Sequence, residues 1–135
     1  MRGKTMKKFY DTSSLLLLEE FNEPIIISSI TLFELEDIKS SPRKDEEVRA
    51  TARNLLRLLD SNDIKHEIII FNMHMLKALE RTGIELNNDA KILATALYYQ
   101  RTFTNDMIFI TNDLAQKAIA SLFFDKEQID SVRVS

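Results

Sequence analysis

A short apolar run that stops at an acid, followed by hydroxyl residues, opens the chain: Lys7-Lys8-Phe9-Tyr10-Asp11-Thr12-Ser13-Ser14-Leu15-Leu16. The two aromatic residues suit a β-strand, whereas Asp, Ser and Thr suit a loop and the start of a helix. Asp11 is therefore predicted to lie at the carboxyl end of the first strand. Because ligands bind at this edge of open α/β sheets, Asp11 is the first candidate functional residue.

The composition favours one globular domain spanning residues 1–135. The chain has 44% hydrophobic and 29% charged residues, which is typical of a folded domain with a core. No apolar run is long enough to cross a bilayer, and the absence of Cys excludes disulfides and thiolate metal sites, so the predicted location is a reducing cytoplasm. The net charge of −3 does not exclude a nucleic-acid partner, because it includes any acids that a bound cation would neutralise.

Strands and helices are predicted to alternate along the chain. Apolar runs predict later strands at residues 25–27, 66–71, 107–110 and 131–134. Helical periodicity and capping residues predict helices at residues 15–20, 30–39, 45–59, 73–81, 88–97 and 113–124. Ser13 or Ser14 is expected to cap the first helix, and Gly83 to end the fourth. This alternation predicts a three-layer α/β/α fold with a mostly parallel central sheet.

Four acids fall just after a predicted strand or at the head of a helix: Asp11, Glu34, Asp89 and Asp113. Parallel winding places the carboxyl ends of the strands on one edge, so these residues are expected to converge there. Close carboxylates repel one another unless a cation binds, and oxygen ligands without Cys or a nearby His suit Mg²⁺ or Mn²⁺ rather than Zn²⁺. Such a metal lowers the pKa of bound water and clamps the oxygens of a phosphodiester.

Each of these acids also has a simpler explanation when it is taken alone. Asp11 fits a turn, Asp89 and Asp113 fit the positive end of a helix dipole, and an acid at position 34 can extend to solvent. Their common placement at strand ends favours the shared metal site over four separate roles.

Basic residues recur in the third helix and in the loop before it: Arg43, Lys44, Arg49, Arg53 and Arg57. They form either a track for RNA phosphates or a solvated helix face with pairs such as Glu46 to Arg53, and the solvated face is favoured. Tyr98 and Tyr99 either stack on bases or pack at a helix end, and packing is favoured.

The chain resembles a PIN domain in four segments: Asp11-Thr12-Ser13, Thr31-Leu32-Phe33-Glu34-Leu35, Asn88-Asp89 with Ile92-Leu93-Ala94-Thr95-Ala96, and Thr111-Asn112-Asp113. Within the family it is most similar to the N-terminal PIN domain of PhoH-like proteins, whose helix pattern residues 53–59 also fit, and to VapC-like ribonucleases. The resemblance spans nearly the whole chain. It implies a Mg²⁺- or Mn²⁺-dependent endoribonuclease acting on RNA, often the toxin of a toxin–antitoxin pair with an antitoxin protein partner, and often a homodimer.

The resemblance also implies roles for individual residues. The four acids would hold the metal and position the attacking water, and Thr111 would orient the first Asp. Ser13 stands where many members have Asn, which is a departure from the family pattern. The chain also lacks the Gly-x-x-x-x-Gly-Lys-Ser/Thr loop of the ATPase half of PhoH-like proteins, so no nucleotide hydrolysis is predicted.

A second interpretation comes from a different functional class. The chain would then be a catalytically weak PIN-fold module that acts by binding a protein or RNA partner, or a second copy of itself. DNA cleavage of the flap-nuclease kind fits less well, because those enzymes use more acids and longer insertions than 135 residues provide.

Overall fold

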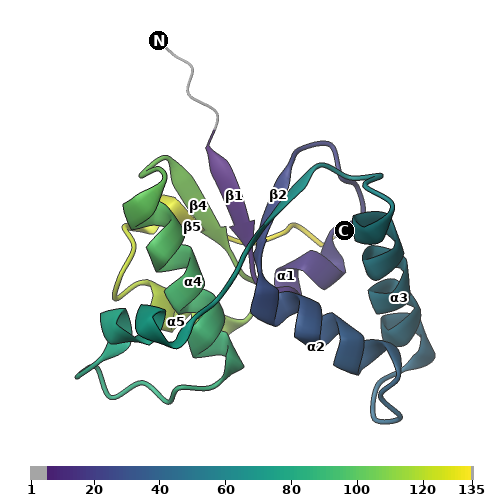
Figure 1. Cartoon of the computed structure of the whole chain (residues 1–135), viewed down its shortest axis with the longest axis horizontal. Helices are drawn as coiled ribbons and strands as arrows, with labels where there is room; N and C mark the ends of the chain where they lie inside the picture. The colour runs from purple at the N-terminus through teal and green to yellow at the C-terminus, as the bar shows by residue number, and fades with distance from the viewer. Residues whose placement is uncertain (1–5, 135) are drawn as a thin grey trace.

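Five parallel strands form one sheet at the centre of the computed structural model, which describes residues 6–134 (Figure 1). The strands are β1 (Lys7–Tyr10), β2 (Ile25–Ser28), β3 (His66–Ile69), β4 (Met107–Ile110) and β5 (Ile129–Asp130). Their order across the sheet is β3-β2-β1-β4-β5, and every neighbouring pair is parallel. Residues 1–5 and 135 of the predicted domain lie outside the described part.

Helices cover both faces of this sheet, which confirms the predicted three-layer α/β/α architecture (Figure 1). They are α1 (Thr12–Leu17), α2 (Ser29–Lys39), α3 (Glu46–Asp60), α4 (Asn88–Thr102) and α5 (Leu114–Ala120), with 3₁₀ helices η1 (Met73–Leu79) and η2 (Lys126–Gln128). Over residues 6–134, none of the helices has the length and apolar character needed to span a bilayer.

The core is divided by the sheet, because successive residues of a strand point to opposite faces. Phe9, Ile26 and Phe109 pack on the face covered by α4, α5 and η1. Ile25 and Ile27 pack on the face covered by α1, α2 and α3. Burial on both faces explains why the run 25–27 is apolar throughout instead of alternating with polar residues.

The first helix begins earlier than predicted, because its cap is Asp11 and not Ser13 or Ser14. Asp11 has extended backbone geometry, and its side chain accepts a hydrogen bond from the backbone N–H of Ser14. The helix therefore starts at Thr12 and ends at Leu17. The acid that ends β1 also begins α1, so no loop residue separates the two elements.

The segment predicted as a helix over residues 73–81 is the 3₁₀ helix η1, which ends at Leu79. The backbone turns away at Arg81, whose φ of 67° lies in the left-handed region. Gly83, with φ of 80°, belongs to the loop that follows and does not end the helix as predicted.

The last strand lies at Ile129–Asp130 and not at the predicted 131–134. After β4 ends, the side chain of Asn112 makes the hydrogen bonds that a neighbouring strand would otherwise make. Asn112 Nδ2 donates to Val132 O at 2.8 Å, and Val132 N donates to Asn112 Oδ1 at 2.9 Å. Ser131 Oγ donates to Thr111 O at 2.8 Å. Residues 131 and 132 are thus fastened to the loop after β4 without forming a strand.

The packing of α2 gives a matched test of the core. We expect Leu35→Ala to lower the free energy of unfolding by about 2–5 kcal/mol, because Leu35 is 0% exposed in the core. Phe33→Ala on the same helix should change it by less than about 0.5 kcal/mol, because Phe33 is 64% exposed. Urea unfolding followed by circular dichroism measures both, and equal effects would contradict this packing.

Candidate functional site

The carboxyl ends of β1 and β4 lie side by side, because the two strands pair in parallel with Tyr10 beside Ile110. The strand order runs from β1 toward β3 in one direction and toward β5 in the other, so the topology switches between β1 and β4. Open α/β sheets bind ligands outside such a switch point. Asp11 follows β1 and Asp113 follows β4, which places both acids at this edge.

Asp11 is 3% exposed, and hydroxyl and amide donors fix both of its carboxylate oxygens. Oδ1 accepts hydrogen bonds from Ser14 N at 2.9 Å, Ser13 Oγ at 2.9 Å and Ser14 Oγ at 2.8 Å. Oδ2 accepts one from Thr111 Oγ1 at 2.5 Å. A carboxylate oxygen has two lone pairs, so Oδ2 is the oxygen of Asp11 with capacity left for another ligand.

Ser13 takes part in this network at the position where many members of the resembled family have Asn. Its hydroxyl donates to Asp11 Oδ1 and accepts a hydrogen bond from Asn112 N at 3.4 Å. A serine hydroxyl both donates and accepts, so it links the α1 start to the loop after β4.

Glu34 is half-buried on α2, and a threonine turns its carboxylate toward the start of α1. Thr12 Oγ1 donates to Glu34 Oε1 at 2.5 Å and lies 3.0 Å from Thr31 Oγ1. Thr12 and Thr31 are both buried. Glu34 is thus accommodated on the apolar stripe of α2, because the buried hydroxyl of Thr12 donates a hydrogen bond to it.

Asp89 and Asp113 head the helices α4 and α5, and Gln116 joins the two helix starts. Gln116 N donates to Asp113 Oδ1 at 3.0 Å, and Gln116 Nε2 donates to the backbone O of Asp89 at 2.8 Å. Gln116 is buried. Asp113 is itself tied to β4, because its N–H donates to Thr111 Oγ1 at 3.1 Å.

The four acids act on one another electrostatically. The pKa of Asp89 is raised above its ordinary value of 3.8, first by burial and then by the negative charges of Glu34, Asp113 and Asp11. The side chains that raise it are the other three acids of the predicted set. Within residues 6–134, however, no three acid, His or Cys side chains lie close enough together to form a ready metal-ligand group. The acids therefore lie near enough for their charges to affect Asp89, but they are not assembled as a set of metal ligands.

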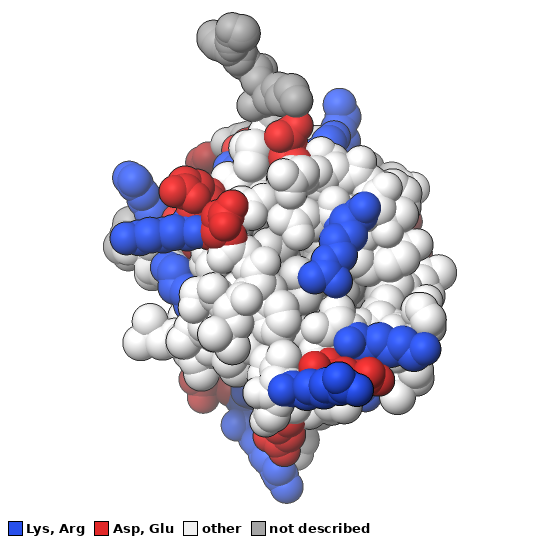
Figure 2. All heavy atoms as spheres, turned by 90° about the vertical axis from the view of Figure 1, so that its left-hand side faces the viewer, with Lys and Arg blue, Asp and Glu red and all other residues white. Residues whose placement is uncertain are grey.

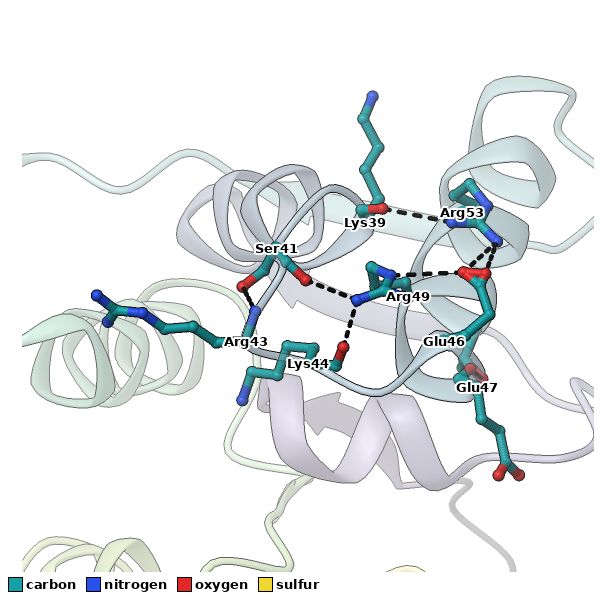
Figure 3. A network of polar contacts seen from close by, with 9 residues as sticks. Lys39, Ser41, Arg43, Lys44, Glu46, Glu47, Arg49 and Arg53 are labelled. Atoms are coloured by element: carbon teal, nitrogen blue, oxygen red, sulfur yellow. Dashed lines mark hydrogen bonds and ion pairs between the residues drawn. The ribbon is translucent and has the colours of Figure 1, made fainter.

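The predicted basic track on α3 is largely engaged in local contacts (Figure 3). Glu46 accepts hydrogen bonds from both Arg49 and Arg53, and each arginine also donates to a backbone carbonyl of the α2–α3 region. Arg57 donates to Asn54 Oδ1 at 2.6 Å. Arg43 and Lys44 are exposed on the loop before α3. Most of these cations therefore make local contacts on a solvated helix face, which is the interpretation that the sequence analysis favoured.

Two supporting contacts were missed by the sequence reasoning. Gln116 follows Asp113 by three residues, a spacing that resembles a capping box, in which the glutamine would fold back onto its own helix start. The buried Gln116 instead reaches the neighbouring helix at Asp89. Ser28 Oγ lies 3.0 Å from Thr95 Oγ1, which joins the start of α2 to the middle of α4, and no local pattern marks that pair.

The shifted pKa of Asp89 generates a stability prediction for protein without divalent cations. A carboxyl whose pKa is higher in the folded state than in the unfolded state lowers stability as the pH rises above 3.8. We therefore expect Asp89→Asn to have a higher Tm than the unsubstituted protein at pH 7 in EDTA. This gain should shrink as the pH falls toward 4, because the carboxyl then becomes neutral.

Differential scanning fluorimetry across that pH range measures the effect, with Glu80→Gln as an exposed control outside the four-acid set. If Asp89→Asn gave no gain at pH 7, the acids would not be coupled as described.

Comparison with known proteins supports the family assignment. The PIN domain family matches residues 7–123, whereas no curated protein matches the chain. The fold is similar to that of a chain in the crystal structure of VapBC2 from Rickettsia felis bound to a DNA fragment from their promoter. That likeness has a TM-score of 0.55 and 22% identity, and it covers 93% of this chain and 98% of the other.

A chain of VapBC-5 from Mycobacterium tuberculosis, a member of the VapBC family of toxin–antitoxin systems, is similar to the same degree. It has a TM-score of 0.55 and 20% identity, and the likeness covers 96% of this chain and 100% of the other. At these identities the two structures establish the shared fold. Because residues 7–123 match the family, the protein belongs to the PIN domain family.

Proposed function

We propose that the protein is a metal-dependent endoribonuclease that hydrolyses RNA phosphodiester bonds at the edge formed by Asp11, Glu34, Asp89 and Asp113. The observation that carries this proposal is the pairing of β1 with β4, which brings Asp11 and Asp113 to one edge of the sheet. The charges of Asp11, Glu34 and Asp113 also raise the pKa of Asp89, after desolvation as the first cause. Acids that repel one another across a sheet edge lower the stability of the fold unless they serve a cation. Membership of the PIN domain family supports the same activity.

The donor set fits Mg²⁺ or Mn²⁺. Its candidate ligands are all carboxylates, and the chain contains no Cys. His66 starts β3 at the opposite edge of the sheet, where its Nδ1 lies 2.9 Å from Ile64 O. Hard oxygen ligands of this kind bind Mg²⁺ and Mn²⁺ in preference to Zn²⁺. The bound metal would supply a more acidic water and charge neutralisation at the phosphodiester.

The protein's own contribution is to fix the carboxylates before substrate arrives. Thr111 holds Asp11 Oδ2 and accepts the N–H of Asp113, so one buried hydroxyl orients two of the acids. Thr12 holds Glu34 in the same way from the other side of Asp11. Side chains that are held in this way need less rearrangement when a metal and a phosphodiester bind.

The biological setting that we propose is a toxin–antitoxin pair. The two structures of similar fold are VapBC2 and VapBC-5, and VapBC-5 is a member of the VapBC family of toxin–antitoxin systems. We infer that this chain is the toxin, that its substrate is RNA, and that an antitoxin protein restrains it. A homodimeric state and a cytoplasmic location remain predictions of the sequence.

The second candidate function is a binding module with weak catalysis. One observation favours it, namely that no three acids in the described part of the chain are assembled as a ready ligand group. The two candidates differ in whether a divalent cation binds at the four acids and whether their loss abolishes RNA cleavage.

Cleavage of a labelled RNA in Mn²⁺ tests the catalytic assignment. We expect Asp11→Asn and Asp113→Asn each to lower the cleavage rate by more than about a hundredfold. Mutation of an outer-shell partner of a metal site already lowers activity by about 10–100-fold, and these acids are proposed to be direct ligands. Asn also caps helices well, so Asp113→Asn should remain folded. Asp125→Asn is the matched control, since Asp125 is likewise an acid at a helix start but lies before β5, at the opposite edge of the sheet. If all variants cut RNA equally, the binding-module function would be favoured.

Metal binding can be measured without any substrate. We expect Mn²⁺ to stabilise the protein by about 2.7 kcal/mol when its concentration is a hundredfold above Kd. Asp89→Asn should lose most of this gain, whereas Asp125→Asn should keep it. Thermal unfolding over a Mn²⁺ titration measures the stabilisation of each variant. Equal stabilisation of both variants would mean that the metal binds elsewhere.

A further inference from the structure

A hollow between η1 and α4 is lined by cationic and aromatic side chains. Its volume is about 360 Å³, and its lining includes His74, Lys77, Tyr98 and Arg101. No acid is among the residues that line it. We call this hollow the η1–α4 groove. It lies on the side of the sheet away from the α3 arginines, because α4 and η1 pack on the opposite face from α3.

The cations of the groove differ from those of α3 in being unpaired. Over residues 6–134, the ion pairs involve Lys8, Lys39, Arg49 and Arg53 but neither Lys77 nor Arg101. Figure 2 shows the side of the molecule that carries α4 and α5, where Lys and Arg side chains, several of them beside Asp or Glu, surround a broad uncharged area. Positive charge that no acid neutralises is available to a polyanion.

An exposed aromatic ring accompanies these cations. Tyr98 is 39% exposed, and its ring meets that of Phe103 edge-on at a centroid distance of 6.2 Å. Tyr98 and Arg101 are three residues apart on α4 and therefore share one face of the helix. An edge-on neighbour holds the ring in place and leaves one of its faces open for stacking.

The groove lies on the same helix as one of the four acids. Asp89 is in the first turn of α4, and Tyr98 follows nine residues later, about 14 Å along the helix axis. At about 100° per residue, however, Tyr98 lies on the opposite side of α4 from Asp89, which borders α5. A strand that joins the acidic edge to the groove therefore has to pass around the helix.

We propose that the η1–α4 groove binds single-stranded RNA, with Lys77 and Arg101 on phosphates and Tyr98 stacked on a base. This rests on the proposed ribonuclease function. Four acids repel a phosphate backbone, and the chain carries a net charge of −3, so affinity for RNA has to come from cations placed away from the site. Cations that track the backbone, together with an aromatic platform for bases, are the means by which proteins hold single strands.

The test measures RNA binding separately from cleavage. Fluorescence anisotropy of a labelled single-stranded RNA is recorded with Asp113→Asn protein, in which cleavage is expected to be blocked. The double variant Lys77→Gln/Arg101→Gln should raise Kd about tenfold and reduce the slope of log Kd against log salt by about 1.4, since each phosphate contact contributes about 0.7 on single strands. Tyr98→Ala should raise Kd about tenfold, whereas Tyr98→Phe should bind normally because it keeps the ring.

The matched control is Arg53→Gln/Arg57→Gln on α3, which removes the same charge from the surface engaged with Glu46 and Asn54. It should leave Kd and the salt slope unchanged. The proposal is overturned if the groove variant binds as tightly as the parent, if the α3 variant is the one that loses affinity, or if the parent binds no RNA. It is also overturned if the groove variant changes the oligomeric state by light scattering, which would make the groove a protein interface.

Failure of this proposal can be told apart from failure of the ribonuclease function. A protein that cleaves RNA, with groove variants that bind normally, loses only the groove proposal. A protein that binds RNA through the groove without cleaving it loses only the nuclease assignment.

Discussion

The hydrogen bond from Thr111 to Asp11 joins the ends of two neighbouring parallel strands, and the candidate site is arranged around it. Its two residues are a hundred positions apart in sequence and meet only because β1 and β4 pair in register. The same hydroxyl accepts the N–H of Asp113. Strand pairing thus brings the two acids to one edge, and the Thr111 hydroxyl holds both residues by donating to the Asp11 carboxylate and accepting the backbone N–H of Asp113. A sheet with a different strand order would leave the same acids on separate surfaces.

The stability of this arrangement comes from hydroxyl and amide groups, because the acids themselves oppose one another. Thr12 supports Glu34, Ser13 and Ser14 support Asp11, and Gln116 spans the starts of α4 and α5. The hydroxyl contacts give the carboxylates of Glu34 and Asp11 polar partners near like charges, whereas Gln116 holds the backbone of Asp89. Under the proposed function, these contacts would hold the acids in place for a cation.

Much of the fold could be predicted from the sequence because its strongest signals are local. The runs at 25–27 and 107–110 are buried strands in the structure, and Asp11 lies where the first strand ends. The errors arose where a partner distant in sequence changes a local preference. Residues 131–134 are not a strand because the Asn112 side chain takes the backbone hydrogen bonds of Val132. The Gln116 side chain, for which no role was predicted, donates to the backbone O of Asp89 on α4. Neither contact can be recognised from a local pattern in a single sequence.

The tether between Asn112 and Val132 makes the loop that bears Asp113 depend on the end of the chain. Lys117, Ser131 and Thr111 extend the same tether, with Lys117 Nζ donating to Ser131 Oγ at 2.8 Å. A displacement of the backbone at Ser131 or Val132 would therefore be transmitted to the segment that places Asp113.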